Sequence, residues 1–97
     1  MAQLIETIRR DREEILAILH QYRAVNARLF GSVARREDQP ESDVDFLVDF
    51  QPGSTLLDHV ALVEALSNKL GHKVDVVSTG ALNRHLAEKI QQEAVSL

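Results

Sequence analysis

The chain has 97 residues, of which 44% are hydrophobic and 27% charged, with a formal net charge of −4 and no cysteine. This length allows one domain with a modest core, expected over residues 1–97, and the missing cysteines exclude disulfides and thiolate metal sites while fitting a reducing cytoplasm. The acidic balance argues against direct nucleic-acid binding. No apolar run approaches the length of about 20 residues that a membrane span needs, so we expect no membrane association, and the N-terminus lacks the apolar segment of a signal peptide.

In chain order, hydrophobic spacing and turn residues predict helix, strand, short helix, strand, helix, strand and helix. These elements are expected at residues 4–22, 25–30, 32–38, 43–50, 56–70, 73–78 and 82–90. Gly31 ends the first strand, and Pro40 lies in the segment that ends the short helix. Thr55 with Asp58 predicts a capping box at the start of the fifth element, and Gly71 predicts its end.

Two of these elements have informative side-chain patterns. Residues 43–50 alternate, with valine and phenylalanine on one face and Asp43, Asp45, Leu47 and Asp49 on the other. Such alternation is typical of a strand with one face in the core. The helix at 56–70 is expected to bury the stripe Leu56, Val60, Val63, Leu66 and Leu70.

The lengths of the connections predict how the strands pair. The link from Phe30 to Asp43 can return the chain antiparallel, whereas the link from Phe50 to His72 contains a full helix, as a parallel crossover requires. This topology places Asp75 on a strand beside the end that carries Asp43. An aspartate between valines is costly to bury without a partner, so a shared cation would explain its position.

Gly31, Ser32, Asp43 and Asp45 form the most informative group in the chain. Residues i and i+2 of a strand point to the same side, so the Asp43 and Asp45 carboxylates repel each other unless a cation neutralises them. Mg²⁺ prefers oxygen ligands and is often shared between carboxylates and substrate phosphates, with Mn²⁺ as an alternative. The Gly-Ser turn offers backbone amides to a phosphate. The group therefore predicts phosphoryl or nucleotidyl transfer.

Each of these residues also has a simpler interpretation. Asp43 alone could be a turn residue that leads into a strand, and Gly31 could serve only to reverse the chain. Arg35 or Arg36 could make a further phosphate contact, although a solvated helix face explains either arginine equally well. Asp49 shares a face with Asp45 but lies about 13 Å along the strand at about 3.3 Å per residue, so we leave it out of the site.

With Asp75 added, this pattern resembles that of the DNA polymerase β-like nucleotidyltransferases, and most closely their minimal nucleotidyltransferase (MNT) domains. The similarity covers nearly the whole chain. It implies an α/β (α+β) fold with a small mixed sheet flanked by about four helices.

The resemblance also implies a mechanism and a partner. Asp43 and Asp45 would hold the Mg²⁺ that binds with ATP, and Gly31 and Ser32 would hold the triphosphate. Asp75 would bind a second metal with Asp45 or act as the base that activates a hydroxyl acceptor. MNT proteins are often antitoxins that adenylylate a tyrosine of a HEPN-domain toxin, so such a toxin is the implied partner. The sequence leaves open whether the protein forms an oligomer with that partner.

Three functional classes remain at this point. The first is a nucleotidyltransferase that transfers AMP to a protein partner. The second is a catalytically silent antitoxin that blocks its toxin by direct binding, against which the intact set of acidic residues argues. The third is a phosphoacceptor domain of the response-regulator type, which also clusters aspartates at strand ends but is longer and has no need of Gly31 and Ser32.

Overall fold

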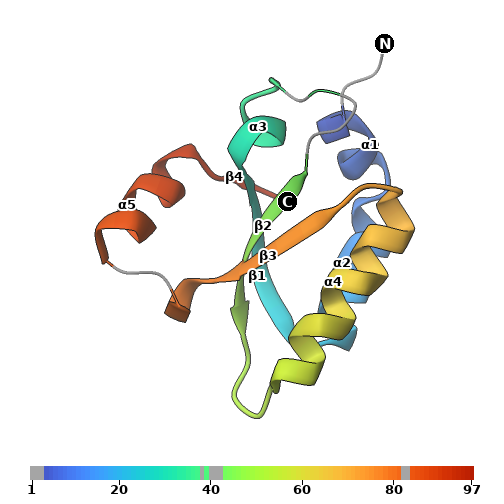
Figure 1. Cartoon of the computed structure of the whole chain (residues 1–97). Coiled ribbons are helices and arrows are strands. Elements are labelled where there is room, and N and C mark those ends of the chain that lie inside the picture. Colours follow the sequence, from blue (N-terminus) through green and yellow to red (C-terminus); the bar gives the residue numbers. More distant parts are fainter. Residues whose placement is uncertain (1–3, 38, 40–42, 82–83) are drawn as a thin grey trace.

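The computed structural model describes residues 4–37, 39, 43–81 and 84–97 (Figure 1). Its helices are α1 (Leu4–Arg10), α2 (Arg12–Gln21), α3 (Gly31–Ala34), α4 (Leu56–Leu70) and α5 (Arg84–Glu93), with a 3-10 turn η1 (Thr79–Ala81). Its strands are β1 (Ala24–Phe30), β2 (Val44–Phe50), β3 (Val74–Ser78) and β4 (Val95–Ser96). The predicted break at Pro40 and the predicted helix start at Leu82 lie outside the described residues.

The four strands form one mixed sheet in the order β3-β2-β1-β4. β1 pairs with β2 antiparallel, and β2 pairs with β3 in parallel across the α4 crossover. The predicted fold class and both predicted pairings are therefore confirmed. β4, which pairs antiparallel with β1, was not expected, because a strand of 2 residues is too short to produce an alternating pattern.

The core lies between the sheet and the helices α1, α2 and α4, which cover one face in Figure 1. Its fully buried members include Ile8, Ile15, Phe46 and Leu66. α5 lies on the other side of the sheet (Figure 1). Leu47 is also fully buried but points to that second face, because it alternates with the core residues of β2. The aspartates of β2 share the second face with Leu47, so the candidate site lies on that side.

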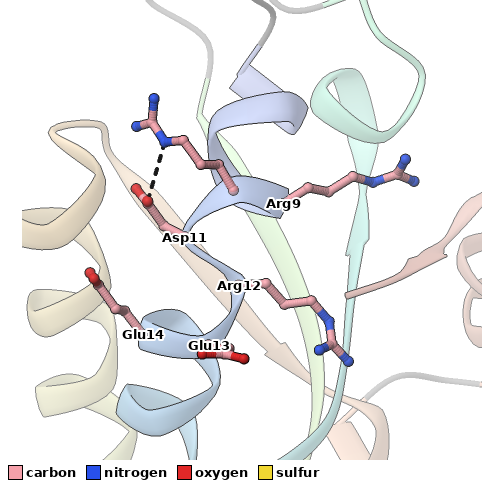
Figure 2. Close-up of a pocket in the computed structure, with 6 residues that line it drawn as sticks. Arg9, Asp11, Arg12, Glu13 and Glu14 are labelled. Carbon is pink, nitrogen blue, oxygen red and sulfur yellow. Dashed lines mark hydrogen bonds and ion pairs between the residues drawn. The ribbon is translucent and has the colours of Figure 1, made fainter.

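The first predicted helix is divided into α1 and α2 at Asp11. Asp11 and Arg12 lie three or four positions from both Ile8 and Ile15, so a continuous helix would turn both charged residues toward the core. The break instead leaves them at the surface, where they help to line a hollow of about 320 Å³ (Figure 2). Arg10 Nε donates to Asp11 Oδ1 at 3.3 Å there.

The ends of α4 follow the prediction, whereas its buried face does so only in part. Thr55 and Asp58 form the expected capping box, and Gly71 ends the helix in a left-handed conformation with φ +68°. The buried face is rotated relative to the predicted stripe. It is centred on Leu62 and Leu66 with Val63 and Leu70 beside them, whereas Leu56 and Val60 are 77% and 55% exposed. The start of the helix extends past the sheet in Figure 1, so its first apolar residues have no strand to cover.

The helices described between residues 4 and 97 all lack the length and apolar character that crossing a membrane requires.

Candidate functional site

The residues singled out from the sequence meet where β1 ends and β2 and β3 begin. The Cα of Asp45 is paired with Phe30 of β1 on one side and with Asp75 of β3 on the other. Asp43 directly precedes β2, and the Val44 N–H donates to the Lys73 carbonyl at 2.9 Å, which extends the β2–β3 pairing to the end of the sheet. The predicted proximity of Asp75 to Asp45 is confirmed.

Gly31 lies against the Asp45 carboxylate. Its φ is +75°, and a Cβ at this position would lie 2.3 Å from Asp45 Oδ2 and 3.3 Å from Asp45 Cγ. Real Cβ atoms do not approach other atoms so closely, and an L side chain is strained at this φ. Glycine is therefore required both by the turn and by the carboxylate that packs onto it, so the turn and the acidic group form one structural unit.

Asp45 is the electrostatic centre of the site. Partial burial, followed by the charges of Asp75 and Asp43, raises the pKa of the Asp45 carboxyl, while the Arg35 guanidinium acts in the opposite direction. Asp75 is exposed at the open edge of the sheet, where β3 is the last strand, so the expected cost of burying this aspartate between valines does not arise. Asp43 faces a cation of its own, because Lys73 Nζ lies 3.8 Å from Asp43 Oδ2.

The segment after Gly31 forms the second wall of the site. α3 has only 4 residues, and the Glu37 N–H closes it by donating to the Ser32 carbonyl at 2.9 Å. Ser32 is half-buried. Arg35 follows the helix and bonds two carboxylates, from Nε to Glu37 Oε2 at 3.1 Å and from Nη1 to Glu93 Oε2 at 3.3 Å. The bond to Glu37 is the largest cause of the raised pKa of Arg35.

The donor set fits Mg²⁺ bound together with a nucleotide. In the part of the chain that the structure describes, no three His, Asp or Glu side chains converge into a ready-made metal cage. Mg²⁺ does not require one, because it keeps several waters and is usually held by one or two carboxylates and substrate phosphates. Asp45, crowded by two further carboxylates, carries the excess negative charge that a cation relieves.

Asp49 has structural partners. It lies on the same face of β2 as Asp45, and it accepts hydrogen bonds from Asn26 Nδ2 at 2.9 Å and from the Thr79 hydroxyl. Asn26 has φ +54° and lies in a bulge of β1, so Asp49 fixes this irregular backbone to β2. Those two hydrogen bonds hold the pKa of Asp49 below its usual range.

Three charged residues near the site were not identified from the sequence: Lys73, Glu37 and Glu93. Lys73 had a local signal, since it precedes Asp75 by two positions and so lies at the same end of the sheet. Glu93 had none, because it is separated from Arg35 by 58 positions. Only the position of α5 in the fold brings Glu93 to Arg35.

Comparisons with known proteins find relatives that cover most of this chain. The family model described as "Polymerase beta, Nucleotidyltransferase" matches residues 13–97. A Methanocaldococcus jannaschii protein, named as a candidate protein adenylyltransferase, is 38% identical over 86 residues, which is 89% of this chain and 92% of that protein. The solved structure of a candidate minimal nucleotidyltransferase superposes with a TM-score of 0.89 at 46% identity and covers 99% of this chain and 97% of its own. A toxin–antitoxin structure with AMP-PNP has a TM-score of 0.76 over 89% of this chain and 71% of its own, and at 19% identity it supports the fold alone.

Proposed function

The chain belongs to the polymerase beta nucleotidyltransferase family, as a minimal nucleotidyltransferase domain, and on this premise we propose that it transfers AMP from ATP to a hydroxyl group of a protein partner. We propose further that residues 1–97 act as one cytoplasmic domain, and that the protein is the antitoxin of a toxin–antitoxin pair whose toxin carries a HEPN domain. The AMP-transfer proposal is supported by the name of the M. jannaschii relative, and the antitoxin role by the fold that the chain shares with the toxin–antitoxin structure.

One observation carries the proposed activity. Asp45 lies between the end of β1 and Asp75 of β3, with its carboxylate directly over the bare Cα of Gly31. This arrangement places a group of carboxylates that can bind a cation beside a turn whose backbone amides can bind phosphate. Binding of a metal-bound nucleotide requires both.

Each residue has a proposed role. Asp43 and Asp45 would hold Mg²⁺, which when bound stabilises the negative charge on the reacting phosphate oxygens. Gly31 and Ser32 would bind the triphosphate, which keeps the α-phosphate in place beside the acidic group.

Arg35 and Asp75 have proposed roles in phosphate binding and in proton transfer. Arg35 would donate hydrogen bonds to the phosphates. Asp75, exposed at the edge of the sheet, would accept the proton of the acceptor hydroxyl. The hydroxyl oxygen then bonds to the α-phosphorus, and the bond to pyrophosphate breaks. The open position of Asp75 suits a macromolecular acceptor, because a hydroxyl presented by another protein can reach it from solvent.

Intact-mass measurement of the partner tests this function. The protein is incubated with ATP, Mg²⁺ and a HEPN-domain protein encoded next to it, and the partner should gain the mass of one or more AMP units. Asp43→Asn should abolish the gain, while Glu64→Gln, on the exposed surface of α4, should leave it unchanged. If the partner keeps its mass and Asp43→Asn still neutralises it in cells, the protein acts by contact alone.

A further inference from the structure

Arg35 is held from two directions. Glu37, two residues further along the chain, accepts from Nε, and Glu93, the last residue of α5, accepts from Nη1. The side chains of Arg35 and Glu93 are about equally exposed, at 43% and 41%. Two acceptors on two different guanidinium nitrogens restrict both the position and the plane of the group.

Among the residues that the structure describes, few donors of the Arg35 guanidinium are occupied, which leaves most of the group available for a ligand. Arginine has five N–H donors, and the two hydrogen bonds use one on Nε and one on Nη1. Within the described residues, both N–H groups of Nη2 lack a partner. Arg35 lies next to the site, since its backbone N–H donates to the Gly31 carbonyl at 3.1 Å and Gly31 packs against the Asp45 carboxylate. An anion bound beside Asp45 would therefore meet donors that are already oriented.

We propose that Glu93 is a positioning residue for nucleotide binding: together with Glu37 it holds Arg35 so that its remaining N–H groups receive a phosphate of the nucleoside triphosphate. This inference rests on the proposed function of the site. It assigns a role in substrate binding to α5, which otherwise lies apart from the carboxylates on β2 and β3. Glu93 acts through Arg35 and does not itself contact the nucleotide.

Glu93 has two opposing effects on a bound triphosphate. Its negative charge repels the phosphates, but this repulsion passes through solvent and is screened by salt. Its hydrogen bond orders a long side chain in advance, so that binding the nucleotide does not have to order it. Because both groups of the ion pair are part-exposed, we expect the ordering effect to be the larger one. Loss of Glu93 should weaken nucleotide binding about two- to tenfold.

Calorimetric titration of Mg-ATP into the full chain tests this proposal through a double-mutant cycle. Glu93→Ala and Arg35→Ala should each raise the Kd, and Glu93→Ala should add nothing in the Arg35→Ala background, because no guanidinium is left to position. Glu93→Gln keeps an acceptor oxygen and should restore part of the affinity. Glu64→Ala removes an exposed carboxylate on α4 and serves as the matched control with an unchanged Kd.

The cycle separates failure of this inference from failure of the proposed function. If Arg35→Ala weakens binding but Glu93→Ala does not, or tightens it, Glu93 has no positioning role while the proposed function stands. An equal effect of Glu93→Ala in both backgrounds would show a structural role that does not act through Arg35. If neither Arg35→Ala nor Asp45→Asn changes Mg-ATP binding, the proposed site is wrong and this inference falls with it.

A second readout needs no nucleotide. In the ligand-free protein, NMR of the Arg35 Nε–H group reports rotation about the Nε–Cζ bond. Rotation should be slow in the wild type and faster in Glu93→Ala, with Glu93→Gln between them. Equal rotation rates in all three proteins would overturn the proposal whatever the affinities are.

Discussion

Replacing Gly31 by alanine tests whether the turn and the carboxylate form one unit. The new Cβ would lie 2.3 Å from Asp45 Oδ2, and the alanine would have to adopt φ +75°. Gly71 provides a matched control, because its φ is +68° and a Cβ there would meet no atom within 4 Å. The difference between the two variants isolates the contact with Asp45 from the backbone strain that they share.

The expected losses of stability follow from the backbone strain and from the contact with Asp45. A left-handed conformation costs an alanine about 1–2 kcal/mol, partly offset by the lower conformational entropy of its unfolded chain. Gly71→Ala should therefore lose about 1 kcal/mol. Gly31→Ala adds an overpacking cost of about 1–3 kcal/mol, because the carboxylate or the turn must move. At about 4–8 °C per kcal/mol, melting temperatures should fall by about 4–8 °C for Gly71→Ala and by about 8–32 °C for Gly31→Ala, whose total cost is about 2–4 kcal/mol.

Thermal unfolding followed by circular dichroism measures both shifts. In an Asp45→Ala background the carboxylate is absent, so Gly31→Ala should cost no more than Gly71→Ala. Mg-ATP binding should be lost in Gly31→Ala and retained in Gly71→Ala. Equal melting-temperature losses for the two single variants, or an extra cost of Gly31→Ala that persists without the Asp45 side chain, would refute the reasoning.

Three further predictions concern single aspartates. The pKa of Asp45 is higher in the folded than in the unfolded state, so ionisation of Asp45 lowers the stability of the protein as pH rises through that raised pKa. Asp45→Asn should therefore raise the melting temperature at pH 7, with a gain that disappears near pH 3. A gain that does not depend on pH would contradict this prediction. Asp75→Asn should keep the Kd for Mg-ATP within a few-fold of the wild-type value and lower kcat about 10²-fold or more, as expected for loss of a general base. AMP transfer at the wild-type rate would show that Asp75 is an ordinary strand residue. Asp49→Ala should lower the free energy of unfolding, measured in urea, by about 1–2 kcal/mol because two hydrogen bonds are lost, and it should leave the affinity for Mg-ATP unchanged. A changed affinity would place Asp49 in the site.

Local patterns and connection lengths were sufficient to place the acidic residues. The alternation around Asp45 defined a strand face, and the link before Asp75 contained a full helix, as a parallel crossover requires, so the proximity of the two residues could be predicted from topology. The capping box at Thr55 and the helix end at Gly71 were predictable for the same reason, since both depend on neighbouring residues.

The remaining features depend on tertiary structure. The break at Asp11 avoids burial of charge, but the apolar spacing on either side of it still follows one helical period. Leu56 and Val60 fit a helical stripe, and their exposure depends on how far the sheet extends beneath α4. The Arg35–Glu93 ion pair joins segments that no sequence pattern relates.

Calorimetric titration of Mg-ATP into the wild type and into the double variant Asp43→Asn, Asp45→Asn tests the central claim most directly. The substitutions preserve side-chain size and relieve repulsion at Asp45, so the variant should remain folded with an equal or slightly higher melting temperature. We predict that the wild type binds Mg-ATP more tightly than Mg²⁺ alone, because phosphate oxygens complete the coordination of the metal, and that the folded double variant does not bind. Wild-type affinity in the double variant would contradict the assignment of this end of the sheet as a nucleotidyl-transfer site.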